Sequence, residues 1–137
     1  EKAIELGDGK AACNLGFMYQ KGLIGKNNDQ PNYEKAAEIY EKAIELGDGK
    51  AAFNLGKMYL DGVIGQLIVV EKGKEKKVSN LLQAEKLFNI AKSRAQTVED
   101  KNCVKNILEN IKKQKLESSI EEFIIYLREG LQLKGLL

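Results

Sequence analysis

Apolar residues recur at helical spacing through most of the chain. In the segment 33–46 they return every three or four residues, which predicts a helix with one buried face. Gly47 follows this segment and suits the left-handed conformation that commonly ends a helix. Asp48 comes next, and its carboxylate can cap the first turn of another helix. The pattern therefore predicts two helices joined by a tight turn.

The same pattern occurs twice, forty residues apart. Residues 1–25 and 41–65 agree at 20 of 25 positions. Such agreement indicates a tandem duplication, and self-similarity at a fixed period is typical of repeat architectures. The glycines form five pairs at this offset, namely 7/47, 9/49, 16/56, 22/62 and 25/65.

Gly16 and Gly56 stand inside predicted helices, where glycine costs about 1 kcal/mol relative to alanine. A cost that recurs in both copies needs a recurring reason. We predict that the backbone of a neighbouring helix approaches closely at each of these glycines. Gly22 and Gly62 are expected to end the same two helices.

The repeat resembles a known family, the Sel-one-like repeat, which is a relative of the tetratricopeptide repeat. The resemblance extends over residues 1 to about 95 and is most specific in residues 8–62. It implies an all-α fold, a right-handed superhelix of antiparallel helix pairs. In the first copy the motif is carried by Ala11, Asn14, Leu15, Gly16, Met18, Tyr19 and Gly22, then by Lys35, Ala36, Tyr40, Ala43 and Gly47.

The second repeat contains a long loop insertion. The counterparts of Ala36 and Tyr40 are Ala84 and Phe88, an offset of 48 instead of 40, so eight residues are inserted. We therefore expect four parts: residues 1–7, a partial helix of a preceding repeat; 8–47, the first repeat; 48–95, the second repeat with an inserted loop at 63–79; and 96–137, a degenerate capping helix pair.

Within the inserted loop, Leu67, Ile68, Val69 and Val70 precede a charged segment centred on Gly73. A β-branched apolar run followed by such a turn predicts a short hairpin. Two interpretations of the apolar run remain open. It either folds back over the edge of the array as extra core, or offers an edge for a partner or a second copy.

The last 40 residues contain two helix-start signatures. Thr97 is a predicted N-cap of an amphipathic helix whose apolar face includes Val104 and Leu108. Ser118 is a predicted N-cap of a second helix, because Glu121 follows three residues later. Because helical arrays need atypical terminal units, we predict that these two helices close the array as a pair.

Composition limits the chemistry. The chain has no histidine, no paired CxxC cysteines and no phosphate-binding glycine loop, so nucleophilic triads and histidine-containing zinc sites are excluded. We predict no catalytic residue, no metal, no cofactor and no enzymatic activity. Cys13 and Cys103 lie two repeats apart, so we expect both to be buried and too distant for a disulfide.

The charge balance does not indicate a nucleic-acid partner, and the hydropathy does not indicate insertion into a membrane. Residues 1–65 carry 8 basic and 10 acidic side chains, and residues 66–137 carry 14 and 10, which is far from the excess of a nucleic-acid binder. No apolar run is long enough to span a bilayer. Because the chain begins inside a helical pattern, we expect a piece of a longer protein, whose location is open between cytoplasm and periplasm or secretion.

In stacked helix pairs the first helix of each repeat usually lines the concave face, so its polar side chains are the candidate partner-binding residues. The resemblance to peptide-binding tetratricopeptide folds suggests Asn14, Asn54 and Asn102 as a ladder of amides that holds a peptide backbone. The alternative is that each side chain bonds within its own helix or to the adjacent loop. Phe17 is an apolar residue where the second copy has Lys57. The candidates are Lys10, Asn14, Phe17, Lys21, Lys50, Asn54, Lys57 and Asp61.

Two functions follow from this reading. The first is an interaction scaffold or adaptor that binds a segment of a partner protein on the concave face. The alternative is a structural spacer or self-association module within a larger protein, for which a secreted bacterial protein is one option. Self-association would use the truncated N-terminal helix or the 63–79 loop, including Leu67–Val70.

Overall fold

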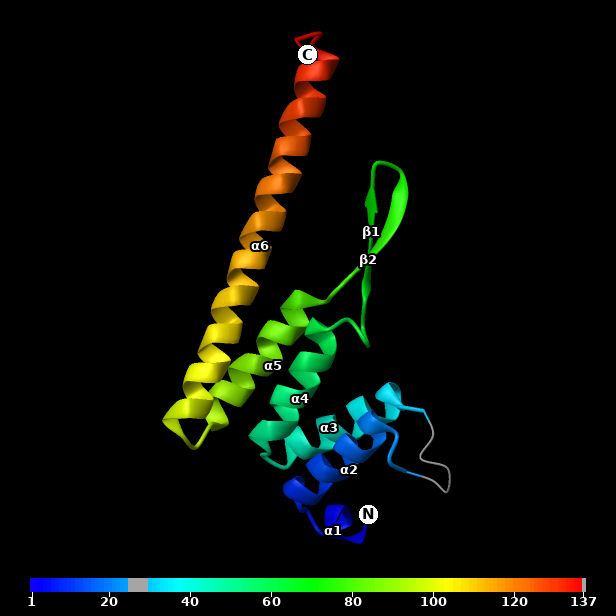
Figure 1. Ribbon diagram of the computed structural model, residues 1–137, viewed down its shortest axis with the longest axis vertical. Coiled ribbons are helices and arrows are strands. Elements are labelled where there is room, and N and C mark those ends of the chain that lie inside the picture. The colour runs from blue at the N-terminus through cyan, green and yellow to red at the C-terminus, as the bar shows by residue number, and fades with distance from the viewer. Residues whose placement is uncertain (25–29, 137) are drawn as a thin grey trace.

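The computed structural model describes residues 1–24 and 30–136 and is mostly helical (Figure 1). Gly25, one of the paired glycines, lies outside the described residues. The elements are α1 (Lys2–Glu5), α2 (Gly9–Lys21), α3 (Tyr33–Glu45), α4 (Gly49–Leu60), β1 (Leu67–Glu71), β2 (Lys74–Val78), α5 (Leu81–Arg94) and α6 (Val98–Leu133).

The five longer helices pack as antiparallel pairs. α2 packs on α3, α4 on α5, and the first half of α6 on α5 (Figure 1). The turns between units are the predicted ones. Gly7 and Gly47 have φ of 88° and 95°. Asp8 then accepts a hydrogen bond from Ala11 N at 3.0 Å, and Asp48 accepts one from Ala51 N at 2.8 Å, which caps α2 and α4.

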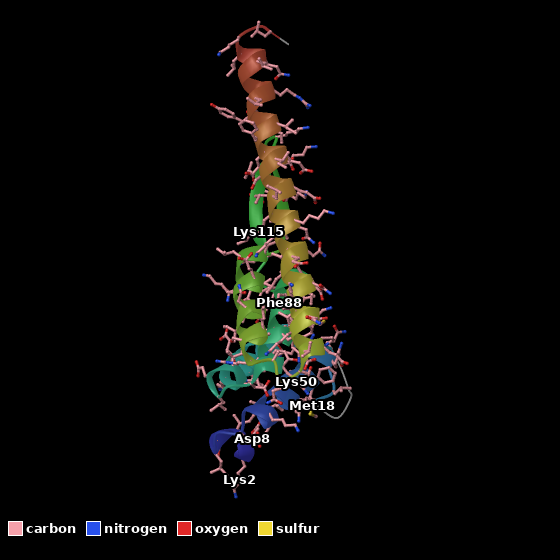
Figure 2. All side chains as sticks on the ribbon, turned by 90° about the vertical axis from the view of Figure 1, so that its left-hand side faces the viewer. Lys2, Asp8, Met18, Lys50, Phe88 and Lys115 are labelled. Atoms are coloured by element: carbon pink, nitrogen blue, oxygen red, sulfur yellow. The ribbon has the colours of Figure 1, made fainter. Side chains whose placement is uncertain are left out.

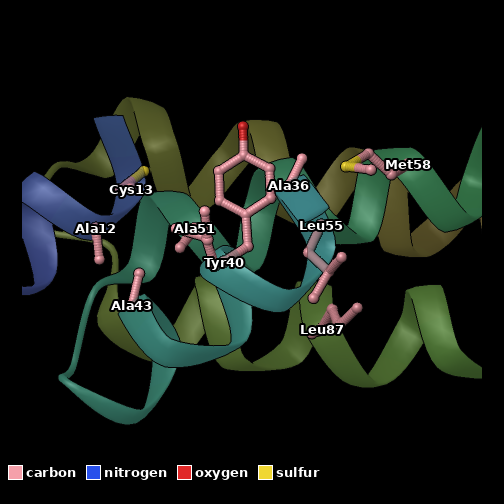
Figure 3. Close-up of a cluster of buried hydrophobic side chains, with 10 residues drawn as sticks. Ala12, Cys13, Ala36, Tyr40, Ala43, Ala51, Leu55, Met58 and Leu87 are labelled. Atoms are coloured by element: carbon pink, nitrogen blue, oxygen red, sulfur yellow. The ribbon is translucent and has the colours of Figure 1, made fainter. Parts of the chain in front are cut away.

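The core runs through the array because α4 is buried on two sides. Ala51, Leu55 and Met58 join the cluster between α2 and α3, where Tyr40 stands among the labelled side chains (Figure 3). Ala52 joins a second cluster formed by α4, α5 and α6. Each helix pair thus uses its neighbour to complete its burial, as in stacked repeat arrays.

The interior glycines provide space for aromatic rings. A Cβ at Gly16 would lie 2.8 Å from the Tyr40 ring, and one at Gly56 would lie 3.2 Å from the Phe88 ring. The predicted close approach is confirmed, but the prediction of a neighbouring backbone was wrong. The space left by the absent Cβ is filled by the largest side chain of the facing helix, so the two helix axes need not come unusually close.

The inserted loop forms the predicted hairpin. β1 and β2 are antiparallel, with Leu67 opposite Val78 and Glu71 opposite Lys74. Lys72 and Gly73 make the turn with φ of 50° and 73°. All five residues of β1 are exposed, including Ile68 at 61% and Val70 at 71%. The interpretation of Leu67–Val70 as extra core is therefore wrong, because these side chains are exposed and the hairpin extends beyond the ends of α4 and α5 (Figure 1).

The C-terminal segment is one helix of 36 residues, and the prediction of a capping helix pair was wrong. The start at Thr97 is confirmed, since Thr97 Oγ1 accepts a hydrogen bond from Asp100 N at 3.1 Å. The second signature fails because no glycine or proline interrupts residues 98–129. Inside the continuous helix, Ser119 Oγ instead donates to the Lys115 carbonyl oxygen at 3.0 Å.

Candidate functional site

The candidate surface on α2 is exposed along its length. Lys10, Asn14, Phe17 and Lys21 recur at spacings of three and four residues, so they share one face of the helix. All four are exposed, and Phe17 exposes 45% of its surface. The Lys21 Nζ lies 5.6 Å from the centre of the Phe17 ring, a cation–π distance that keeps the ammonium beside this apolar side chain.

The corresponding stripe on α4 is exposed except at Asn54. Lys50, Lys57 and Asp61 are exposed, whereas Asn54 is half-buried. Its amide Nδ2 lies 4.0 Å from Cys13 Sγ on α2, so the α4 stripe borders α2. The structure thus brings the two predicted stripes onto adjoining helices.

The asparagines do not form a uniform ladder. Asn54 Nδ2 donates to Tyr40 Oη at 3.5 Å, and Tyr40 Oη donates to Gln20 Oε1 at 2.6 Å. Asn54 therefore bonds across α2, α3 and α4, whereas Asn14 and Asn102 are exposed. The helix facing Asn102 carries Phe88 at the position of Tyr40, and phenylalanine has no hydroxyl to offer.

Burial raises the pKa of both ionisable groups of this cluster. It raises the pKa of the Cys13 thiol to about 11, with the nearby Asp48 carboxylate adding to the effect and Lys50 opposing it. Burial likewise raises the pKa of the Tyr40 hydroxyl. Both groups therefore hold their protons at neutral pH, so the cluster acts by packing and hydrogen bonding, not as a source of nucleophiles.

The two cysteines have different surroundings. Cys13 is buried as predicted, but Cys103 is exposed, so the expectation of burial was wrong for it. Both are free thiols, in agreement with the predicted absence of a disulfide. α6 buries Val104 and Leu108 against α5. Cys103 precedes Val104 by one residue and therefore points to a different side of the helix, where it is exposed.

The hairpin and the end of α6 add further exposed apolar side chains. Leu67, Ile68, Val69 and Val70 are all exposed, so they remain available for contact. Sequence reasoning missed the exposure of the second half of α6, because it assigned those apolar residues to the buried face of a separate helix. The signal was present: the positions that continue the stripe of Val104, Leu108 and Ile111 are Lys115, Ser118 and Glu122, which are polar.

Two features bear on the type of site. Across the described ranges 1–24 and 30–136, no three His, Cys, Asp or Glu residues group as metal ligands would. Among the helices of the described residues, none combines the length and the apolar character needed to cross a bilayer.

Comparison with known proteins identifies the repeat. The family model for the Sel1 repeat matches residues 9–48 and again residues 49–94, together more than half of the chain. No curated protein and no solved structure matches the chain. Sel1 repeats form helical arrays related to tetratricopeptide solenoids, which are generally protein-interaction modules and usually non-catalytic. The chain belongs to the Sel1 repeat family.

Proposed function

We propose that the chain is a non-catalytic interaction scaffold whose α2 and α4 stripes bind an extended segment of a partner protein. The observation that carries the proposal is the exposed Phe17 with Lys21 beside it, on a helix that adjoins the Lys50 and Lys57 stripe. An exposed aromatic ring next to basic side chains offers an apolar anchor and a charge complement together.

The positive charge of this surface favours an acidic partner segment. Four of its eight side chains are lysines and one is an aspartate. Among the described residues, none of these lysines forms an ion pair with a carboxylate. An acidic, extended segment with one large apolar side chain would complement both the unpaired ammonium groups and Phe17. Asn14 is available to bond the backbone of such a segment, whereas Asn54 is largely committed to Tyr40.

Selection from a displayed random-peptide library tests this function. We expect enrichment of acidic peptides that contain a large apolar residue. For an enriched peptide, Phe17→Ala should weaken binding about fivefold to tenfold, and the double reversal Lys50→Glu/Lys57→Glu about tenfold or more, measured by fluorescence anisotropy.

The matched control is Lys86→Glu/Lys92→Glu, which changes the net charge equally through two exposed lysines of α5. This control should leave the affinity within about twofold. Equal losses from the two double variants would show that binding follows net charge and not this surface. A library that yields no acidic peptides would contradict the proposal.

A second candidate function is a spacer or self-association module. The exposed apolar strand β1 favours it, since strands with exposed edges and apolar side chains tend to pair with other chains. Val70→Lys should abolish an oligomer formed through this hairpin, as followed by light scattering. An unchanged oligomer would assign association to another surface.

A further inference from the structure

α6 buries one face near its start and exposes a different apolar face near its end. Val104, Leu108 and Ile111 are buried against α4 and α5. The second half of the helix stands clear of the repeats, with side chains projecting from it along its length (Figures 1 and 2). Its exposed apolar stripe consists of Leu116, Ile120, Phe123, Ile124, Leu127 and Leu131, each between 39% and 61% exposed.

This distal stripe points away from the rest of the molecule. At about 100° per residue, its centre lies roughly 150° around the helix from the face that carries Val104 and Ile111. Lys115 marks the inner face, because its Nζ lies 3.2 Å from Glu85 Oε2 on α5. The hairpin lies on that same inner side of α6 (Figure 1). No element of the described chain is therefore placed to cover the distal stripe.

The spacing of the distal stripe is symmetric. Reading from either end, the intervals are 4, 3, 1, 3 and 4 residues. An antiparallel second copy centred between Phe123 and Ile124 consequently matches every apolar residue with an apolar residue. The three matched pairs, each formed twice, are Leu116 with Leu131, Ile120 with Leu127, and Phe123 with Ile124.

The charges beside the stripe fit the same arrangement. Glu117, Glu121 and Arg128 lie on one flank of the stripe, and in an antiparallel pair these flanks adjoin. Arg128 of one copy then falls midway between Glu117 and Glu121 of the other, about 3 Å along the axis from each. Lys113 and Lys134 face each other at the two ends, which limits the pairing to residues 116–131.

We propose that the chain dimerises through an antiparallel pairing of the distal stripes of α6 in two copies. Covering six half-exposed apolar side chains on each copy removes on the order of 1,000 Å² in total, the lower range for a specific protein interface. We therefore expect a reversible dimer with a dissociation constant in the micromolar range. This association goes beyond the partner-binding role proposed for α2 and α4 and leaves those helices free.

Sedimentation velocity over a range of concentrations of the full chain tests the dimer. The mass should rise from 15.3 kDa toward twice that value. Ile120→Glu/Leu127→Glu should weaken the dimer about 100-fold or more, because the four side chains of two apolar contacts become charged. These side chains are exposed in the single chain, so circular dichroism should show an unchanged fold at low concentration.

Neighbouring glutamates provide a matched pair of variants. Glu121→Arg should weaken the dimer about tenfold. Glu121→Arg/Arg128→Glu should recover part of that loss, because the contact between residues 121 and 128 is re-formed with reversed charges while the unchanged Glu117 then faces a glutamate. Glu122→Arg adds the same charge on the inner face and should change the affinity less than about twofold.

Disulfide trapping reports the direction of the helices. In a Cys103→Ser background, a mixture of Ile120→Cys and Leu127→Cys chains should cross-link to each other. Ile120→Cys alone should not, because two copies of residue 120 lie about 10 Å apart along the axis of an antiparallel pair. A monomer at all concentrations, a dimer that survives the stripe variants, or efficient linking of residue 120 to itself would overturn the proposal.

Discussion

The helix pairs α2–α3 and α4–α5 share one packing plan but surround its central aromatic ring differently. Tyr40 fills the space above Gly16, and Phe88 fills the space above Gly56. The Tyr40 hydroxyl is bonded to Gln20, whereas Phe88 packs edge-on against Phe53, with ring centres 5.6 Å apart.

The sequence differences between the copies follow this change. Cys13 and Gln20 of the first copy correspond to Phe53 and Leu60 of the second. A ring with a hydroxyl is thus accompanied by a polar partner, and a ring without one by apolar neighbours. The same helix pair therefore accommodates either a tyrosine with polar neighbours or a phenylalanine with apolar ones, provided that ring and neighbours change together, because a buried hydroxyl without a partner is destabilising.

Removing the ring of the second repeat should have the largest effect. Phe88 is fully buried among α4, α5 and α6, so Phe88→Ala should lower the free energy of unfolding by about 3–4 kcal/mol. Urea denaturation followed by circular dichroism measures this change. Phe17→Ala, at a ring that is 45% exposed, should cost less than about 1 kcal/mol. Similar losses for both variants would contradict the central role given to Phe88.

Cys13, the counterpart of Phe53 in the first repeat, should react slowly with thiol reagents. Raising the Cys13 pKa from 9.0 to about 11 lowers the thiolate fraction at pH 8 roughly 100-fold relative to the unfolded chain. Because the thiolate is the reactive form, the labelling rate should rise about tenfold per pH unit below that pKa. An aromatic disulfide reagent measures both rates by absorbance.

Cys103 is the internal reference for this labelling, since it is exposed. Cys103→Ser should leave only the slow phase, and Cys13→Ala only the fast one. Two equally fast thiols in the native protein would show that the interior of the first repeat is open to reagent.

The two interior glycines should respond unequally to alanine. The added Cβ at Gly16 would lie 2.8 Å from the Tyr40 ring, closer than the 3.2 Å at Gly56, and the rigid ring must shift. We expect Gly16→Ala to cost about 1–2 kcal/mol net, since crowding outweighs the gain in helix propensity, and Gly56→Ala to cost less.

Gly130 is the control for these glycine variants. It lies inside α6 with no atom within 4 Å of an added Cβ, so Gly130→Ala should stabilise the chain by up to about 1 kcal/mol. Thermal unfolding of the three variants measures the order. A stabilising Gly16→Ala would refute the tighter fit assigned to the first repeat.

Local signals in the chain predicted the repeats, the caps at Asp8, Asp48 and Thr97, and the hairpin, because each depends on residues close in sequence. These signals gave wrong or incomplete predictions where the structure of a residue depends on a different helix or strand. Ser118 has a capping pattern, but a helix starts there only if the preceding one stops, and no residue stops it. The exposure of Phe17 followed from helical periodicity. The engagement of Asn54 did not, because its partner Tyr40 comes from the preceding helix.

Replacing Tyr40 and Gln20 by the residues found in the second repeat should have the smallest effect on stability, and it tests whether the two side chains are coupled. Tyr40→Phe removes the hydroxyl and leaves Gln20 Oε1 without its 2.6 Å donor, so it should cost about 1 kcal/mol. Gln20→Leu alone removes the acceptor of the Tyr40 hydroxyl and should cost a similar amount. The double variant reproduces the pairing of Phe88 with Leu60 and should cost less than the sum, with a coupling near 1 kcal/mol.

Tyr126→Phe, at a ring that is 71% exposed, serves as the control and should change stability by less than about 0.5 kcal/mol. Urea unfolding of the unsubstituted chain, the two single variants and the double variant gives the cycle, and strict additivity would mean that Tyr40 and Gln20 are not a matched pair.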